Sequence, residues 1–124
     1  IRAFADGLER GRIVNLLDTR VLGDDRTHLS YHLSKRVLHS LTKLAALEYA
    51  PRITVNAVAP GPILPPPGEG AEYMERARSF VPLNRTGTLK EVSDAVLFLL
   101  RSDFITGQVV FVDGGRHLYG GPYG

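Results

Sequence analysis

The sequence predicts an α/β fold built on a parallel β-sheet. Segments with apolar residues at helical spacing alternate with short runs rich in Ile and Val, and only a few residues separate each run from its neighbouring helix. The segments follow in the order helix, strand, helix, strand, two helices, strand. Strands joined through helices pair in parallel by right-handed crossovers, so we expect their carboxyl ends to share one edge of the sheet.

The first half of the chain supplies two of the three predicted strands. Residues 1–11 have the pattern of a helix in its last turns, and RIVNLL, residues 12–17, follows as a buried strand. After a polar loop, apolar residues at helical spacing predict a long helix over residues 30–49. RITVNAVAP, residues 52–60, is then short and β-branched enough to be a second buried strand.

The second half begins with a loop that cannot be regular structure, because PGPILPPPGEG, residues 60–70, is dominated by Pro and Gly. Long loops in compact domains often carry function. Two helices and a strand are predicted after it, over residues 71–80, 89–101 and 107–115. Thr88 and Glu91 have the spacing of a capping box at the start of the longer helix.

Composition excludes several classes of function. The 124 residues are 44% hydrophobic and 23% charged, with a net charge of +2 and basic residues scattered among acids, so we expect no nucleic-acid partner. There is no cysteine, and the four histidines share no metal-ligand spacing with carboxylates, so we assign no metal. No apolar stretch is long enough to span a membrane, and we expect a cytoplasmic protein.

Tyr31 and Lys35 are the first candidates for chemistry. They are four residues apart near the start of a predicted helix, which places both side chains on one face. An ammonium group beside a phenol stabilises the phenolate and lowers the pKa of the phenol, so that the phenol can exchange a proton near neutral pH. The alternative is an unremarkable surface tyrosine with a solvated lysine next to it.

The surroundings of this pair complete a family pattern. The strand VNLL ends before Tyr31, Ser34 precedes Lys35, the strand and loop ITVNAVAPGPI follow the helix, and TGQVVFVDGG comes last. From Gly11 to Gly115 this order resembles the second half of a short-chain dehydrogenase/reductase. The resemblance implies a Rossmann-type, doubly wound parallel sheet in which residues 1–124 are the C-terminal portion of a single domain.

The resemblance also implies roles for individual residues. The Tyr of the family is the general acid that protonates the substrate as hydride arrives from the nicotinamide, and the Lys tunes the Tyr and binds the nicotinamide ribose. Carried over, Asp18, Tyr31 and Lys35 are the catalytic candidates. Cofactor contacts are expected from Tyr31, Lys35, Pro60, Gly61 and Ile63, and substrate contacts from Asp18, Tyr31, Pro62 and Leu64. The alternative to a cofactor contact for Pro60 and Gly61 is a plain turn.

Asp18 departs from the common pattern of the family. Most members carry a Ser about thirteen positions before the Tyr, whereas this chain carries NLLD. Pteridine reductases and the similar bacterial dihydromonapterin reductases also have an Asp there. A carboxylate can accept hydrogen bonds from a pterin ring and, when burial raises its pKa, relay a proton to a ring nitrogen. The alternatives are that Asp18 caps a turn or replaces the Ser in an inactive enzyme.

The leading hypothesis is therefore an NADPH-dependent oxidoreductase that reduces a 7,8-dihydropterin, with dihydrofolate or biopterin as further substrates. NADPH follows from the resemblance alone. A phosphate-binding loop is absent from the sequence, so we expect a missing N-terminal half, and the family implies a homo-oligomer, a tetramer or a dimer. The alternatives are a short-chain reductase of another carbonyl or alcohol, or a non-catalytic oligomerising domain of the same fold.

Three other residues have less certain uses on sequence grounds. Tyr73 and Met74, on the short helix after the proline-rich loop, have the spacing to close over a flat ring, although packing of an amphipathic helix is the favoured interpretation. Arg85 is either a hinge or a contact residue, and the sequence does not decide between them.

Overall fold

The computed structural model of the chain describes residues 5–23 and 28–119. Its elements in chain order are β1 (Gly11–Leu16), the 3₁₀ helix η1 (Thr19–Leu22), α2 (Leu29–Glu48), β2 (Ile53–Pro60), α3 (Ala71–Arg78), α4 (Leu89–Arg101), β3 (Val109–Val112) and the 3₁₀ helix η2 (Arg116–Tyr119). The long helix, the three strands and the two later helices all occur where the sequence predicts them.

The three strands form one parallel sheet in the order β1, β2, β3. Gly11 pairs with Ile53 at one end of the β1–β2 ladder, and Leu16 pairs with Val58 at the other. The predicted parallel sheet is confirmed. Because the strands run the same way, the carboxyl ends of β1 and β2 lie at one edge, which is where Asp18 and the proline-rich loop begin.

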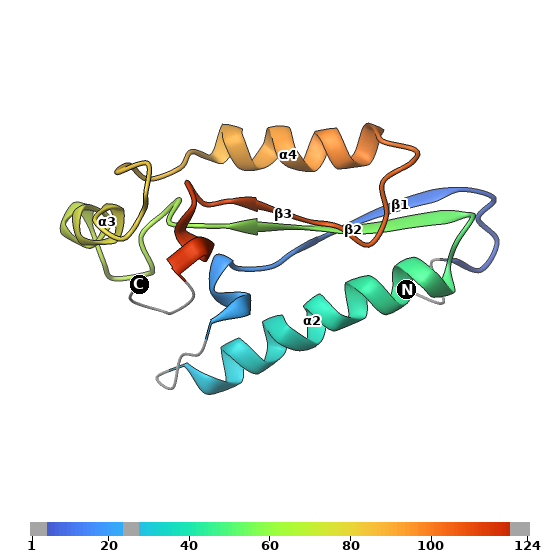
Figure 1. Cartoon of the computed structure of the whole chain (residues 1–124), viewed down its shortest axis with the longest axis horizontal. Helices are drawn as coiled ribbons and strands as arrows, with labels where there is room; N and C mark the ends of the chain where they lie inside the picture. Colours follow the sequence, from blue (N-terminus) through green and yellow to red (C-terminus); the bar gives the residue numbers. More distant parts are fainter. Residues whose placement is uncertain (1–4, 24–27, 120–124) are drawn as a thin grey trace.

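The central strand β2 is buried almost along its whole length, as a strand covered on both faces must be. Helix α2 packs on one face of the sheet and α4 on the other, while α3 lies beyond the carboxyl ends of the strands (Figure 1). The sheet is therefore closed above and below, and its carboxyl edge is left for the loops and for α3.

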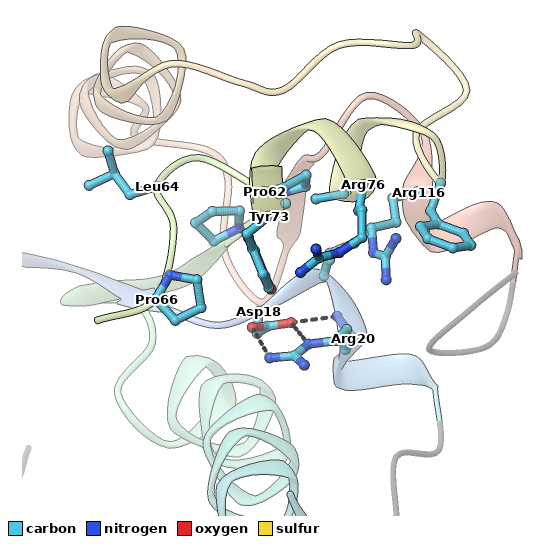
Figure 2. A pocket seen from close by; sticks show the side chains of 13 residues that line it. Asp18, Arg20, Pro62, Leu64, Pro66, Tyr73, Arg76 and Arg116 are labelled. Atoms are coloured by element: carbon cyan, nitrogen blue, oxygen red, sulfur yellow. Dashed lines mark hydrogen bonds and ion pairs between the residues drawn. The ribbon is translucent and has the colours of Figure 1, made fainter. Parts of the chain in front are cut away.

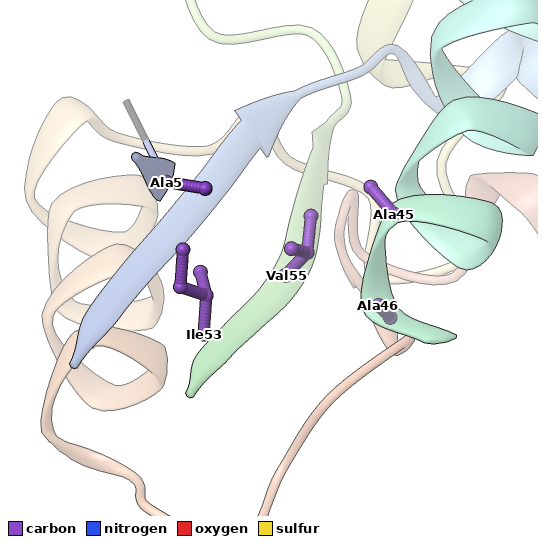
Figure 3. Close-up of a cluster of buried hydrophobic side chains, with 5 residues drawn as sticks. All are labelled: Ala5, Ala45, Ala46, Ile53 and Val55. Carbon is purple, nitrogen blue, oxygen red and sulfur yellow. The ribbon is translucent and has the colours of Figure 1, made fainter. Parts of the chain in front are cut away.

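The core between α2 and the sheet depends on small residues. Ala45 and Ala46 of α2 pack with Ile53 and Val55 of β2 and with Ala5, and all five side chains are buried (Figure 3). Alanine on the inner face lets the helix backbone approach the strands closely, so that the β-branched side chains of β2 fill the space between them.

Leu38 of α2 packs against a second core cluster of Leu17, Ala57 and Ala59. Most of the other large apolar residues of α2 point away from the core. Five of them form one exposed stripe along the helix: Leu33, Val37, Leu41, Leu44 and Leu47. Leu44 is 65% exposed. The helical period predicted from these residues is confirmed, but the face that they mark is the outer face of α2 and not the core face.

Several boundaries differ from the sequence-based prediction. Leu17 lies just past β1, although its N–H still donates to the carbonyl of Val58 at 2.8 Å. The predicted loop that follows contains η1, and α3 ends at Arg78, two residues earlier than expected. Residues 1–4 of the helix expected before Gly11 lie outside the described residues, and residues 6–10 form turns and bends instead of a helix.

The start of α4 agrees with the predicted capping box. The Glu91 N–H donates to the Thr88 hydroxyl at 3.2 Å, and the Thr88 N–H donates to the Glu91 carboxylate at 2.9 Å. Arg85 pairs with the same carboxylate and, with the bonds from Thr88, holds the pKa of Glu91 down at about 2. Within residues 5–23 and 28–119, none of the helices combines the length and the apolar character that a membrane span requires.

Candidate active site

Asp18 begins the site because of where β1 ends. The strand stops at Leu16, and Asp18 then takes an extended backbone conformation as the N-cap of η1. Its carboxylate accepts a hydrogen bond from the N–H of Arg20 at 2.8 Å, which satisfies a donor at the start of the turn. The interpretation of Asp18 as a turn cap is therefore correct, but it is not the whole role of this residue.

The side chain of Arg20 binds the same carboxylate. Its Nε donates to Oδ1 at 3.1 Å and its Nη2 to Oδ2 at 3.2 Å, so the two planar groups face each other as a forked pair. Burial by itself raises the pKa of Asp18, but the hydrogen bonds and the charge of Arg20 outweigh it and leave the pKa below its ordinary value. Asp18 is thus ionised, and the expected rise in its pKa is wrong.

Tyr31 meets Asp18 across thirteen residues of sequence. Its hydroxyl donates to Asp18 Oδ2 at 3.0 Å, from the third residue of α2. The contact forms because α2 packs against η1, the 3₁₀ helix that begins directly after Asp18. The structure therefore places Asp18 and Tyr31 in direct hydrogen-bond contact, which the sequence alone left as a hypothesis.

Lys35 lies one turn further along α2. Its Nζ donates to the main-chain carbonyl of Leu16 at 2.8 Å and lies 5.7 Å from the centre of the Tyr31 ring. The ammonium group is thus placed beside the ring and at the end of β1, not at the phenolic oxygen. The predicted common face of Tyr31 and Lys35 is confirmed.

The pKa of Tyr31 differs in direction from the prediction. Burial and the negative charge of Asp18 raise it above its ordinary value of 10.0, because both disfavour the phenolate. Arg20 acts in the opposite direction, and its guanidinium carbon lies 5.6 Å from the centre of the Tyr31 ring. Tyr31 in this arrangement is a protonated donor aimed at a carboxylate.

A cavity of about 460 Å³ opens beside Asp18, within the range typical of ligand sites. Its lining residues come from the end of β1, the proline-rich loop, α3 and η2: Asp18, Thr19, Arg20, Pro60, Gly61, Pro62, Leu64, Pro66, Tyr73, Arg76, Ala77, Phe80 and Arg116. Figure 2 shows the Asp18–Arg20 pair on one wall, with Arg76 and Arg116 projecting from the opposite side.

The cavity gathers some of the predicted site residues and not others. Asp18, Pro60, Gly61, Pro62 and Leu64 line it. Three predicted residues are not in its wall: Tyr31, which reaches it through Asp18; Lys35; and Ile63, whose side chain packs against Gly87. Arg85 also lies outside, bound to Glu91.

Sequence reasoning missed the basic and aromatic part of the wall. Arg20, Arg76, Phe80 and Arg116 lie in three separate segments, and no spacing in the sequence connects them. For Tyr73 the sequence favours packing of an amphipathic helix. That prediction is wrong, because α3 contains no buried residue and Tyr73 faces the cavity (Figure 2).

A buried carboxylate ties the two ends of this wall together. Asp113, just past β3, has a side chain only 1% exposed and accepts hydrogen bonds from the Thr19 hydroxyl and from the N–H groups of Gly115 and His117. The ring of His117 also binds it, at 3.0 Å, and stacks on Phe111. The cluster fixes η1, which carries Arg20, relative to η2, which carries Arg116.

Gly61 has a packing role at the same edge. Its N–H donates to the carbonyl of Val112 at 3.0 Å, and a Cβ at this position would lie 2.8 Å from the backbone of Asp113. A side chain cannot be accommodated there without moving β3. This close approach gives a structural reason for glycine, and the expected cofactor contact of Gly61 stays a prediction. In the parts of the chain that the structure describes, no three potential metal ligands lie together.

Comparison with known proteins identifies the family of the chain and several relatives. The family model described as enoyl-(acyl carrier protein) reductase matches residues 2–117. A glucose 1-dehydrogenase of Gluconobacter oxydans is 42% identical over 75% of this chain, and a dihydromonapterin reductase of Citrobacter koseri is 39% identical over 86%.

A solved structure has the same fold and a similar sequence. The FolM alternative dihydrofolate reductase 1 from Brucella canis, complexed with NADP, superposes with a TM-score of 0.84 and 38% identity over 94% of this chain. The chain spans 48% of that protein, 44% of the Citrobacter reductase and 38% of the Gluconobacter dehydrogenase, so it corresponds to less than half of each.

Proposed function

We propose, from the premise that this chain belongs to the short-chain dehydrogenase/reductase family, that the protein reduces a 7,8-dihydropterin with NADPH. The observation that carries the proposal is the hydrogen bond from the Tyr31 hydroxyl to the ionised carboxylate of Asp18 at the cavity wall. A pterin presents an amino-amide edge of N–H donors, and an ionised carboxylate accepts such bonds.

The residues of the site divide the chemistry between them. We assign the proton donor to Tyr31, whose hydroxyl is protonated at neutral pH since its pKa lies above the ordinary value of 10.0. Asp18 orients that hydroxyl and binds the amino-amide edge of the substrate. Since Arg20 keeps Asp18 ionised, Asp18 acts as an acceptor and not as the acid, which replaces the proton relay expected from the sequence.

The same end of the sheet has donors suited to a nicotinamide ribose. The Lys35 ammonium lies at the carboxyl end of β1, where it can donate to a ribose hydroxyl, and the Tyr31 oxygen can accept a hydrogen bond from one. NADPH supplies hydride when bound. We propose that Lys35 and Tyr31 hold its ribose, that Pro60, Gly61 and Ile63 border its ring, and that Pro62 and Leu64 border the substrate.

We further propose that the functional protein includes an N-terminal dinucleotide-binding half and that these residues are its C-terminal portion. The support is that the chain spans 44% of a dihydromonapterin reductase that it matches. An intact mass of 13.6 kDa for a protein with reductase activity would contradict this part of the proposal. A cytoplasmic location belongs to the same proposal, supported by the lack of cysteine.

The oligomeric state is also proposed. The support is the exposed apolar stripe of α2 (Leu33, Val37, Leu41, Leu44 and Leu47). Contiguous apolar surface of this kind marks interaction sites. We propose a homo-oligomer, a dimer or a tetramer, assembled through this face.

Replacing Asp18 tests the function. We expect Asp18→Ser to lower kcat/KM for a dihydropterin about 100-fold, as loss of a preorganised charged group does, while the dissociation constant of NADPH changes little. Steady-state NADPH oxidation measures kcat/KM, and fluorescence titration measures the dissociation constant of NADPH. Asp94→Ser, which removes an exposed carboxylate on α4, is the matched control. Equal losses of pterin reduction and of NADPH binding would contradict the role of Asp18.

A second candidate function is reduction of an ordinary carbonyl, or oxidation of an alcohol, favoured by the similarity to a glucose 1-dehydrogenase. Rates of NADPH oxidation with a dihydropterin, compared with rates for a panel of ketones and sugars, separate the two candidate functions. If no pterin supports NADPH oxidation, pterin reduction is excluded. If Tyr31→Phe leaves the biological function unchanged, the non-catalytic oligomerising domain is the remaining hypothesis.

A further inference from the structure

Helix α3 turns its apolar face to the cavity and not to the protein core. Ala77 lies one turn after Tyr73 on α3, Phe80 follows just past the end of the helix, and all three line the cavity. None of the residues of α3 is buried. The apolar face of an amphipathic helix normally packs against the rest of the protein. Because this face covers a cavity instead, a ligand in the cavity would complete its packing.

Tyr73 is the part of this face that reaches furthest toward chemistry. Its side chain is half-buried and points from α3 toward Asp18 (Figure 2). Across residues 5–23 and 28–119, its hydroxyl makes no hydrogen bond and its ring makes no aromatic or cation–π contact. The Phe80 ring, by contrast, already has the guanidinium carbon of Arg116 5.8 Å from its centre. Of these two rings, Tyr73 is therefore the one that the described residues leave for a ligand.

The other walls of the cavity suit a flat ring with one polar edge. The Asp18 carboxylate is fixed by its hydrogen bonds with Arg20 and Tyr31, so it offers acceptors at a defined place. Pro62 and Pro66 of the proline-rich loop also line the cavity, and proline adds apolar surface without an N–H donor. A ring that donates to Asp18 along its edge therefore presents its two faces to apolar groups.

We propose that Tyr73 is a specificity-determining residue whose ring stacks on one face of the flat heterocycle that donates its N–H edge to Asp18. The inference rests on the proposed function. Stacking of two conjugated rings adds to the free energy of their burial. A sugar or an open-chain ketone has no conjugated face and cannot make this contact. Tyr73 thus favours a pterin over the substrates of the second candidate function.

Two substitutions of Tyr73 separate its ring from its hydroxyl. Tyr73→Leu removes the ring and keeps an apolar side chain, whereas Tyr73→Phe removes the hydroxyl alone. We expect Tyr73→Leu to raise the KM for 7,8-dihydrobiopterin about 10-fold, the scale of losing one stack on a heterocycle, with kcat changed less than about twofold. Tyr73→Phe should keep KM within about twofold of the wild-type value. Equal effects of the two substitutions, or none from Tyr73→Leu, would overturn the proposal.

Met74→Ala is the matched control, because Met74 is the next residue of α3, is also half-buried and does not line the cavity. It should leave the KM for 7,8-dihydrobiopterin unchanged. A rise in KM as large as that of Tyr73→Leu would show a general disturbance of α3 and would contradict the stacking contact. Since α3 buries none of its residues, the melting temperature of ligand-free Tyr73→Leu should stay within about 2 °C of the wild-type value.

A binding measurement separates this proposal from the proposed function. With NADP⁺ present no reduction occurs, and calorimetry gives the dissociation constant of 7,8-dihydrobiopterin for the wild-type protein, Tyr73→Leu and Tyr73→Phe. Binding that weakens about 10-fold in Tyr73→Leu and is kept in Tyr73→Phe supports the stacking contact even when no pterin is reduced. Equal binding by the wild-type protein and Tyr73→Leu, or no binding by the wild-type protein, would overturn it whatever the turnover.

Discussion

Asp18 shows how one residue can serve a turn and a reaction together. Its carboxylate caps η1 by accepting a hydrogen bond from the N–H of Arg20, and it also accepts one from the hydroxyl of Tyr31. The two roles reinforce each other, because the arginine that completes the cap keeps the carboxylate ionised for the tyrosine. The sequence pattern located this residue and Tyr31, but the lowered pKa of Asp18 depends on Arg20, which no motif marks. The raised pKa of Tyr31 depends on burial and on the charge of Asp18.

The charge of Asp18 should be visible in the titration of Tyr31. Because that charge helps to raise the pKa of Tyr31, Asp18→Asn should lower the pKa toward its ordinary value near 10. Tyrosinate absorbance, taken as the difference between each protein and its Tyr31→Phe counterpart, measures the shift. Asp94→Asn, on α4, should leave the titration unchanged. An unchanged or higher pKa in Asp18→Asn would contradict the assigned contact.

At the scale of elements, the site is assembled by segments that end at one edge of the sheet. The 3₁₀ helices η1 and η2 bring Arg20 and Arg116 to the cavity, and α3 brings Tyr73 and Arg76. Asp113 joins η1 to η2 through Thr19 and His117. The cavity wall therefore depends on the buried hydrogen-bond cluster of Asp113, although Asp113 does not itself line the cavity.

Loss of the Asp113 cluster should weaken the fold in a pH-dependent way. Although burial raises the pKa of Asp113, its hydrogen bonds from Thr19 and His117 lower it below the ordinary value of 3.8. Its stabilisation is thus complete above about pH 4 and is lost as the pH falls through the lowered pKa. Asp113→Asn should cost about 1–3 kcal/mol of unfolding free energy at pH 7, measured by denaturant titration.

The difference between Asp113→Asn and the wild-type protein should shrink below pH 4, because the wild-type carboxylate then protonates as well. Asp94→Asn is the exposed control, and its effect should stay within about 0.5 kcal/mol. A constant difference down to pH 2 would show that the charge of Asp113 does not contribute to stability.

At the scale of the whole molecule, the exposed apolar stripe of α2 is the feature that supports the proposed homo-oligomer. Leu44→Glu places a charge in the centre of this stripe and should convert the proposed oligomer to a smaller species, because a buried unpaired charge is costly at an interface. Light scattering coupled to size-exclusion chromatography measures the mass.

The matched control for this prediction is Leu83→Glu. Leu83 and Leu44 are both 65% exposed, but Leu83 lies in the loop after α3. The control should keep the mass of the wild-type protein. If Leu44→Glu keeps it too, α2 is not the interface.

The sequence by itself determined the order of the elements, the parallel sheet and the capping box of α4. These follow from hydrophobic period and short spacings, which act along the chain. The grouping of Asp18 with Tyr31 and Lys35 followed from the resemblance of the sequence to a family. Only the tertiary structure decided that Arg20, Tyr73, Arg76 and Arg116 share one cavity, that the large apolar face of α2 points outward, and that Asp18 has a lowered pKa. Those properties depend on which distant segments meet and on burial and charge at their contacts, and neither quantity is encoded in local spacing.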